Sequence, residues 1–322
     1  MQRRFLDYLT ISFKGIAMGA ADVVPGVSGG TIAFISGIYE ELIESIDNIN
    51  VGVFKTWKTK GFKVAWNSVN GNFLLALFLG IAISIFSLAK SIKWLLANEP
   101  ILLWSFFFGL VLASIWFIGK QIKNWNVILI LALIATSIAS YFITKTEPFA
   151  SPDSLLYLLF CGFLAIIAMI LPGVSGAFIL LILGAYTTAI DTVDDLREGI
   201  SSLNFELLKD AFIRLLMLGL GAILGLKVFS KLLNWMFKNK KNLTLAILTG
   251  FMIGSLNKIW PWKNVLSYRA NSHGEQVPLL EESISPLSFV GDNQLTMAIV
   301  LMVIGILSII ILEFLGKKKT SS

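Results

Sequence analysis

Hydrophobic residues recur in long, nearly unbroken runs that are separated by short polar segments. A helix needs ~20 residues to cross a bilayer core of ~30 Å, and several runs reach or approach this length. They predict membrane-spanning helices near residues 72–96, 101–119, 125–143, 211–237, 243–260 and 294–315. Two further apolar stretches, 16–39 and 154–190, contain Pro-Gly pairs and predict broken helices that return to the side from which they enter.

The composition is that of an integral membrane protein. Apolar residues make up 56% of the sequence and charged residues 14%, with a mean hydropathy of +0.79, which is far above that of soluble domains. The single cysteine, Cys161, excludes an internal disulfide. Basic residues are spread over loop ends, so nothing indicates nucleic-acid binding. No short apolar segment with a small-residue cleavage site precedes residue 16, and we expect no removable signal peptide.

The distribution of lysine and arginine predicts the orientation. With a cytoplasmic amino terminus and hairpins that return to their own side, the cytoplasmic parts are residues 1–15, 40–71, 119–124, 231–242 and 313–322. These parts hold sixteen of the 26 basic residues and only six acidic residues. The positive-inside rule favours this arrangement, so both termini are expected to be cytoplasmic.

The pentapeptide Pro-Gly-Val-Ser-Gly occurs twice, at residues 25–29 and 172–176. Aligned without a gap, residues 21–39 and 168–186 are identical at ten of nineteen positions. Three predicted crossings separate the two copies, and an odd number inverts the second copy relative to the first. We therefore expect an all-α polytopic fold of two inverted-topology repeats, residues 1–148 and 149–322, each with a re-entrant hairpin and three transmembrane helices.

Each pentapeptide has the residue types of an anion site at a helix start. Proline ends a helix, and glycine adopts backbone angles that other residues avoid. The helix that restarts has free N–H groups and the positive end of its dipole, which together bind phosphate. The alternative is that Gly-Ser-Gly only permits close helix packing. The candidate phosphate ligands are Pro25, Gly26, Ser28, Gly29, Gly30, Thr31, Pro172, Gly173, Ser175 and Gly176.

Charged residues inside the spans are a second indication of function, because charges are costly in a bilayer. Arg214 is the candidate counter-charge for an anionic headgroup, since a guanidinium can bind phosphate oxygens in pairs. The alternative is that Arg214 extends to the outer interface. For Lys90 and Lys227, which take similar places in the two repeats, extension to the interface is the favoured interpretation.

Other polar residues flank the first hairpin. Lys14, Glu40 and Glu41 are interpreted as a solvated rim, with proton coupling as the alternative for the two glutamates. Asp22 precedes the first motif by three residues and is a further candidate for proton coupling. The single histidine, His273, lies in a long polar outside loop, residues 263–292, and no chemical role is expected for it.

Residues 14–31, KGIAMGAADVVPGVSGGT, resemble the signature of a family of bacterial polytopic membrane proteins, the PopT type. Residues 168–176, AMILPGVSG, with Gly184-Ala185-Tyr186 behind them, resemble its second signature. The resemblance covers nearly the whole chain. It implies a translocase in the bacterial cytoplasmic membrane that returns undecaprenyl phosphate, the carrier lipid of cell-wall synthesis, to the cytoplasmic leaflet. The residue roles taken from the resemblance are limited to the two motifs and do not include Arg214.

Two alternatives stay open. Undecaprenyl-diphosphate phosphatases also have inverted repeats and re-entrant Pro-Gly-x-Ser loops, but their motif continues into arginine where this chain has Gly29 and Gly176. A transporter of another anionic lipid or of a small anion would have the same fold and site. We expect no enzyme activity, no catalytic residue, no metal and no cofactor. The expected partners are undecaprenyl phosphate and the lipid bilayer, and a homodimer is left open.

Overall fold

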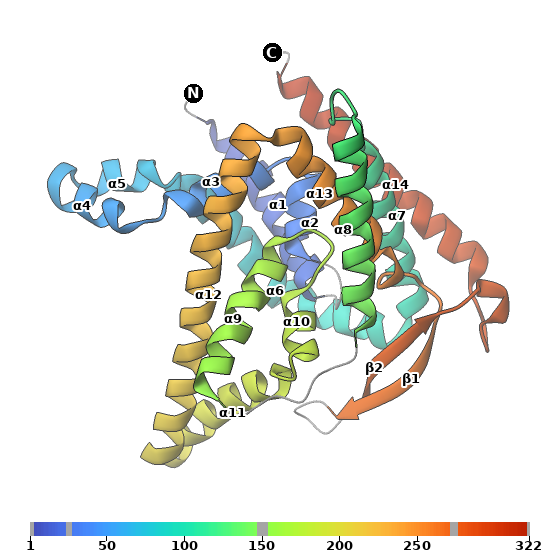
Figure 1. The fold of residues 1–322 in the computed structure, drawn as a ribbon. Coiled ribbons are helices and arrows are strands. Elements are labelled where there is room, and N and C mark those ends of the chain that lie inside the picture. The colour runs from blue at the N-terminus through green and yellow to red at the C-terminus, as the bar shows by residue number, and fades with distance from the viewer. Residues whose placement is uncertain (1–2, 24–27, 147–153, 271–275, 321–322) are drawn as a thin grey trace.

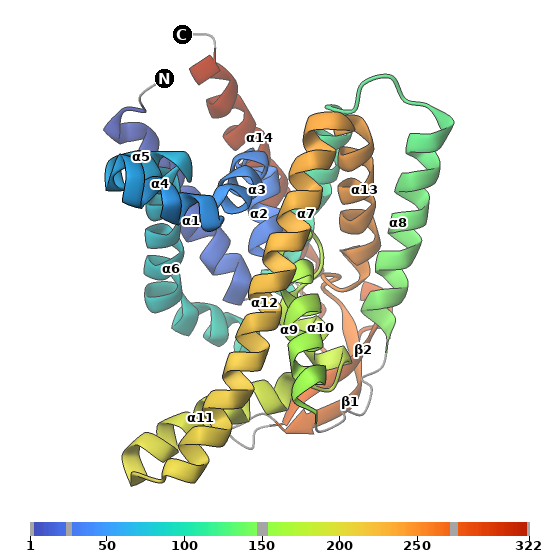
Figure 2. The same cartoon turned by 60° about the vertical axis from the view of Figure 1, so that its left-hand side comes forward.

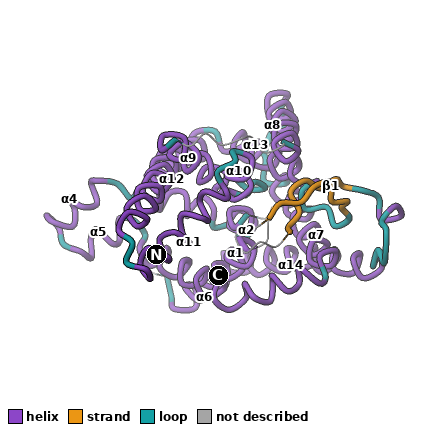
Figure 3. Tube along the Cα trace, turned by 90° about the horizontal axis from the view of Figure 1, so that it is seen from below, coloured by secondary structure: helices purple, strands orange, loops and turns teal. Residues whose placement is uncertain are grey.

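The computed structural model describes residues 3–23, 28–146, 154–270 and 276–320. Within these ranges the chain is predominantly helical, with a single two-stranded antiparallel sheet (Figures 1 and 3). The α-helices are α1 (Phe5–Val23), α2 (Gly29–Ile35), α3 (Tyr39–Asn48), α4 (Val51–Lys60), α5 (Phe62–Ser68), α6 (Gly71–Asn98), α7 (Pro100–Gly119), α8 (Val127–Lys145), α9 (Leu155–Ile170), α10 (Gly176–Ile182), α11 (Tyr186–Ser202), α12 (Phe205–Asn239), α13 (Lys241–Gly254) and α14 (Leu295–Thr320). The strands are β1 (Lys263–Ala270) and β2 (Gln276–Ser283), and the short 3-10 helices are η1 (Ser255–Asn257) and η2 (Pro286–Ser288).

Four of the described helices, α6, α7, α8 and α12, are long and apolar enough to cross a membrane. Helix α9 and the Leu295–Ile311 part of α14 are shorter apolar helices, and α10 and α11 form a pair bent by 107°. Large apolar side chains such as Phe86, Ile128 and Ile223 are exposed on these helices, as expected of surfaces that face lipid. The predicted class, an all-α polytopic membrane protein, is confirmed.

Two predicted boundaries differ from the structure. The first broken segment was expected to begin at residue 16, but α1 already begins at Phe5. This helix packs along α6, where the Ser12 hydroxyl donates to the Ala76 carbonyl oxygen. The predicted crossing 243–260 is interrupted. Helix α13 ends at Gly254 and a 3-10 turn follows, since polar residues replace the apolar run from Ser255 onward.

Corresponding helices of the two halves make matching contacts through glycine. A β-carbon at Gly15 of α1 would meet the Leu77 carbonyl of α6, and one at Gly162 of α9 would meet the Leu218 carbonyl of α12. Gly15 and Gly162 are 147 positions apart, the same offset as the two pentapeptides. The α1–α6 pair and the α9–α12 pair are therefore packed in the same way, with backbones in direct contact.

A second set of matching contacts joins the two halves to each other. A β-carbon at Gly109 of α7 would meet the Met302 carbonyl of α14. One at Gly250 of α13 would approach the Leu133 carbonyl of α8. In each pair the helix before the last helix of one half, α7 or α13, packs on the last helix of the other half, α14 or α8, so neither half closes its own bundle.

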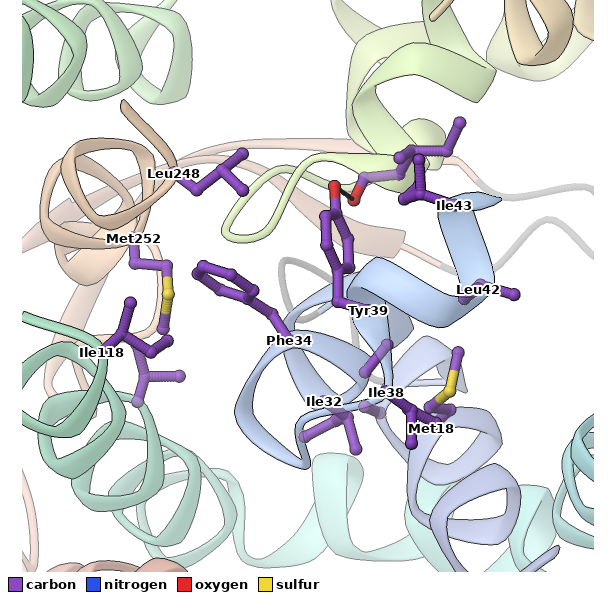
Figure 4. Close-up of a cluster of buried hydrophobic side chains, with 14 of the residues drawn as sticks. Met18, Ile32, Phe34, Ile38, Tyr39, Leu42, Ile43, Ile118, Leu248 and Met252 are labelled. Atoms are coloured by element: carbon purple, nitrogen blue, oxygen red, sulfur yellow. Dashed lines mark hydrogen bonds between the residues drawn. The ribbon is translucent and has the colours of Figure 1, made fainter. Parts of the chain in front are cut away.

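The largest buried apolar cluster surrounds α2 and α3. Phe34 and Tyr39 lie edge to face with ring centroids 5.2 Å apart, and Tyr39 is 1% exposed. Figure 4 shows the Phe34 ring directed toward Leu248 and Met252 of α13, both of which are fully buried. The core therefore packs the first broken segment against helices of both halves (Figures 1 and 2).

The predicted polar loop 263–292 contains the β-hairpin. Strand β1 pairs with β2 in an antiparallel register that joins Lys263 to Ser283. Trp260 and Trp262 anchor the hairpin, because their indole N–H groups donate to the backbone carbonyls of Ile284 and Asn293, each at 2.8 Å. His273 lies outside the described residues.

Candidate functional site

The first break separates α1 from α2. Its Pro25 and Gly26 lie outside the described residues. Ser28 is the N-cap of α2, and its hydroxyl oxygen accepts a hydrogen bond from Gly30 N–H at 3.1 Å. The Gly29 N–H donates to the Asp22 carboxylate at 2.6 Å. The expectation that α2 begins with free N–H groups is therefore wrong for these two groups, because the chain supplies its own oxygen acceptors.

The second break, between α9 and α10, lacks this internal cap. Gly173 has φ +89°, a left-handed conformation that favours glycine. Ser175 is the N-cap of α10, but its side chain makes no capping hydrogen bond. Where the first break has Asp22, the second has Met169, so the carboxylate acceptor is missing. The half-buried Ser175 hydroxyl and the start of α10 therefore have capacity for an oxygen-bearing ligand.

The two breaks contact each other directly. The Gly173 N–H donates to the Thr31 hydroxyl oxygen at 2.9 Å, and the Ser28 hydroxyl donates to the Met169 carbonyl oxygen at 3.0 Å. The Tyr39 hydroxyl donates to the Ile170 carbonyl oxygen, also at 3.0 Å. Figure 4 shows the Tyr39 ring directed toward this end of α9. Three buried side chains of the first half thus hold the backbone of the second break.

The motif glycines permit this close approach. A β-carbon at Gly30 would lie 2.6 Å from the Ile170 carbonyl oxygen, and one at Gly29 would lie 2.5 Å from a carboxylate oxygen of Asp22. In the second break, a β-carbon at Gly173 would lie 2.5 Å from the Ser255 hydroxyl, and one at Gly176 would lie 2.7 Å from the Ala165 carbonyl. Close packing, the alternative interpretation of the motifs, accounts for these glycines and leaves the uncapped Ser175 unexplained.

Lys14 lies at the other end of α2. Its ammonium group donates to the Ser36 carbonyl oxygen at 2.6 Å, beyond the last residue of that helix. A cation in this position stabilises the negative end of the helix dipole. Lys14 therefore holds the carboxyl end of α2, at the opposite end of that helix from Ser28 and Gly29.

The acidic residues of α3 form ion pairs along the rim of the bundle. Glu41 pairs with Arg3 at 2.5 Å, and Glu40 pairs with Lys241 at 2.7 Å. Both pairs are partly solvent-exposed, and exposed pairs contribute ~0–1 kcal/mol each. Both glutamates therefore have cationic partners at partly exposed positions, and their interpretation as a solvated rim stays a prediction.

Lys227 of α12 binds the end of a helix from the first half, and its extension to the interface stays a prediction. Its half-buried ammonium donates to the backbone carbonyl oxygens of Ile46 at 3.2 Å and Asp47 at 2.9 Å, at the carboxyl end of α3. The last carbonyls of a helix lack partners within it, so they attract a cation. Lys90 belongs to α6, and its side chain lies outside the described part of the structure.

Arg214 lies on an exposed surface of α12. Its guanidinium is 3.9 Å from the Asp195 carboxylate of α11, and the side chain of Arg214 is 44% exposed. The described contacts of Arg214 do not include either break. The structure therefore brings together Ser28, Thr31 and Gly173 from the predicted set and leaves Arg214 apart from them.

Two contributors were not predicted from the sequence. Tyr39 is shared by the aligned segments, with Tyr186 as its counterpart, and this identity was the available signal for its contact with α9. Lys258 lies beside α10, with its ammonium 4.9 Å from the centre of the Phe178 ring. It shares the Glu281 carboxylate with Lys263, at 3.4 and 3.3 Å. Nothing in the local sequence indicates that this cluster lies against α10.

Among the described residues, no cluster of three or more His, Cys, Asp or Glu side chains could hold a metal ion.

Three comparisons with known proteins bear on the family. The profile of the undecaprenyl phosphate translocase-like family matches residues 18–277. A polyprenyl-phosphate transporter of Vibrio cholerae is 44% identical over 322 residues, covering 99% of this chain and 100% of the relative.

A polyprenyl-phosphate transporter of Staphylococcus aureus is 31% identical over 261 residues, covering 77% of this chain and 84% of the relative. No solved structure matches the chain. The chain belongs to the undecaprenyl phosphate translocase-like family.

Proposed function

We propose that this protein transports a polyprenyl phosphate, undecaprenyl phosphate, from the outer to the cytoplasmic leaflet of the bacterial cytoplasmic membrane. The names of the two relatives, both polyprenyl-phosphate transporters, support the substrate class. The observation that carries the proposal is the direct contact between two breaks with unequal caps, one closed by Asp22 and one open at Ser175.

The open break is the proposed entry site for the phosphate. The Ser175 hydroxyl and the first N–H groups of α10 would donate to phosphate oxygens, and Pro172, Gly173 and Gly176 would allow the headgroup to approach the backbone. Arg214 would attract the headgroup before this step, because it is exposed and its pair with Asp195 is long at 3.9 Å. A phosphate would compete well with that carboxylate for the guanidinium.

Transfer to the first break requires its internal cap to open. The N–H groups of Gly29 and Gly30 would exchange Asp22 and Ser28 for phosphate oxygens, while Thr31 would release Gly173. Asp22 then faces an incoming anion of the same charge, so its protonation would favour transfer. Inward movement of an anion is opposed by the membrane potential by about 2.3 kcal/mol per charge per 100 mV, and a proton taken up with the lipid would offset this cost.

The alternation of access would use the two repeats, residues 1–148 and 149–322, as inverted units that rock against each other. The matching glycine contacts of Gly15 and Gly162 support this relationship. The bonds between Thr31 and Gly173 and between Ser28 and Met169 cross the boundary of the units, so they would break and reform in each cycle. The polyprenyl tail would remain in lipid, along the exposed apolar faces of the bundle.

The test is transport in liposomes that contain the purified protein and fluorescent undecaprenyl phosphate in the outer leaflet. The proposal predicts protein-dependent movement of the lipid to the inner leaflet and strong loss in Ser175→Ala. Ser105→Ala is a matched control, since its buried hydroxyl donates within its own helix to the Ile101 carbonyl oxygen.

Phosphate release from undecaprenyl diphosphate is measured in the same preparation. Release of phosphate would contradict the proposed transport function and favour a phosphatase. Transport of a soluble anion without movement of the lipid would contradict the proposed lipid substrate. Movement of the fluorescent lipid without phosphate release supports the proposal.

A further inference from the structure

Helices α4 and α5 form a hairpin that packs little against the rest of the bundle. Figure 1 shows the hairpin projecting sideways, across the direction of α12, and Figure 3 shows it outside the outline of the other helices. It turns at Gly61, whose φ of +87° favours glycine. A pair of short helices without a packed outer surface needs another partner to cover its apolar side chains.

Aromatic rings run through the hairpin in one continuous series. The Phe54 ring lies 5.4 Å from that of Trp57, Trp57 lies 6.4 Å from Phe62, and Phe62 stacks on Trp66 at 5.6 Å. Phe54 and Phe62 are 55% and 61% exposed. These rings also line an apolar cavity of about 130 Å³ between the helices. Tryptophan and phenylalanine at a surface of this kind are typical of the boundary between lipid and water.

The charge of the hairpin has one sign. Residues 49–70 contain four lysines and no aspartate or glutamate. The four are Lys55, Lys58, Lys60 and Lys63, and all are exposed. Lys58 extends over the Phe54 ring, with its ammonium 5.0 Å from the ring centre, so a cation and an apolar ring are presented side by side. This combination matches a surface with negative headgroups above apolar chains.

The hairpin is held at the depth where a membrane span begins. The Trp66 indole N–H donates to the Asn72 side-chain oxygen at 2.8 Å, in the first turn of α6. The apolar span of α6 starts at Gly71, so Trp66 lies next to the beginning of that span. Figure 2 shows α4 and α5 at the same end of the bundle as both termini.

We propose that the α4–α5 hairpin lies in the membrane interface on the side of the termini and binds acidic phospholipids there. The aromatic series inserts between lipid headgroups, and the four lysines bind their phosphates. The hairpin would then hold the first broken segment, through α3, at a fixed depth while other parts of the bundle move. The experiment below distinguishes binding of this surface to lipid from binding to a protein partner.

The experiment places a fluorophore on the full-length protein in liposomes. The background is Cys161→Ala, which removes the native thiol. Phe54→Cys carries the label on the aromatic side of α4, and Thr59→Cys carries it five residues later, about 140° around the helix. Quenching is measured with phosphatidylglycerol or phosphatidylcholine that has a nitroxide on its headgroup, at equal mole fractions.

The expected result is strong quenching at position 54 and weak quenching at position 59. Phosphatidylglycerol should quench at least about fivefold more effectively than phosphatidylcholine, because the attraction of one lysine to an acidic surface, about 1 kcal/mol, corresponds to a factor of about five. Replacing the four lysines by glutamine should abolish the preference between lipids. The thermal unfolding of this glutamine variant should stay unchanged, since none of the four lysines forms an ion pair within the described residues.

Equal quenching by the two lipids would overturn the binding of acidic headgroups. Absence of quenching by either lipid at position 54 would overturn the location and favour a protein partner or water. Persistence of the lipid preference after all four lysines are replaced would also contradict the proposal.

Discussion

The Thr31 hydroxyl oxygen accepts a hydrogen bond from the backbone N–H of Gly173 at 2.9 Å, and the two residues are 142 positions apart. This bond joins the first helix after one break to the turn of the other. Both groups are buried, so neither can exchange its partner for water without local opening. The contact therefore ties the position of one break to that of the other.

Thr31→Val tests the strength of this tie. Valine retains the shape of threonine but provides no acceptor, so the buried Gly173 N–H loses its partner at a cost of about 1–3 kcal/mol. We expect lower thermal stability in detergent, measured by intrinsic tryptophan fluorescence. Thr249→Val is the control, because its hydroxyl donates to Leu245 within a single helix. Equal losses in both variants would show that the contact between breaks has no special role.

The close contact of α9 and α12 gives a second prediction. A β-carbon at Gly221 would meet the Leu159 carbonyl, whereas one at Gly219 on the same helix would have no heavy atom within 4 Å. Gly221→Ala should destabilise the protein by about 1–3 kcal/mol through overpacking. Gly219→Ala should be neutral or stabilise it by up to about 1 kcal/mol, because alanine favours helix. Unfolding of the purified variants measures both effects, and the reverse order would contradict the described packing.

Asp22→Asn separates the charge of the first cap from its hydrogen bond. Asparagine retains an oxygen that can accept from Gly29 N–H, but it no longer repels an anion. The account predicts tighter binding of undecaprenyl phosphate, by about tenfold for each 1.4 kcal/mol of repulsion removed, and weaker dependence of transport on pH. Titration of purified protein with the lipid, followed by native mass spectrometry, measures the affinity. Weaker binding with unchanged pH dependence would rule out a competing carboxylate.

Lys263 predicts a pH dependence of stability. Its ammonium is buried against Trp104, and this burial lowers the pKa of Lys263 from 10.5 to about 8, although Glu281 opposes the shift. Between these two values the unfolded chain binds more protons than the folded chain, so stability rises with pH across that window. Lys263→Met should remove the rise. Thermal unfolding from about pH 7 to about pH 10.5 measures it, and parallel curves for the two proteins would contradict the assignment.

Much of the fold could be predicted because the signals are local. Hydrophobic runs gave the crossings near α6, α7, α8 and α12, and the repeated pentapeptide located both breaks. The predicted span 243–260 was too long, because an apolar average hides the point where Ser255 begins the 3-10 turn. Helices α4 and α5 and the β-hairpin were not predicted, because they lie in polar loops that contain too few apolar residues for a membrane crossing.

The site was predicted less completely because its contacts are non-local. The pentapeptides identified Ser28 and Ser175, but the sequence did not indicate that Asp22 accepts from Gly29 and closes the first break. The contact of Lys227 was not predicted for a related reason. Its partners are the carbonyls of Ile46 and Asp47, about 180 positions away, and no local pattern brings a lysine to a distant helix end. The proposed part of Arg214 stays a prediction.

The central claim is that the open second break binds the phosphate, and binding measures it most directly. Undecaprenyl phosphate is titrated into wild-type protein, Ser175→Ala and the matched Ser105→Ala in the same detergent, with headgroup affinity as the readout. The account predicts that Ser175→Ala weakens binding by about tenfold or more, as loss of a hydrogen bond to a charged group would, while Ser105→Ala binds as wild type. Unchanged affinity in Ser175→Ala, with the protein folded, would contradict the account.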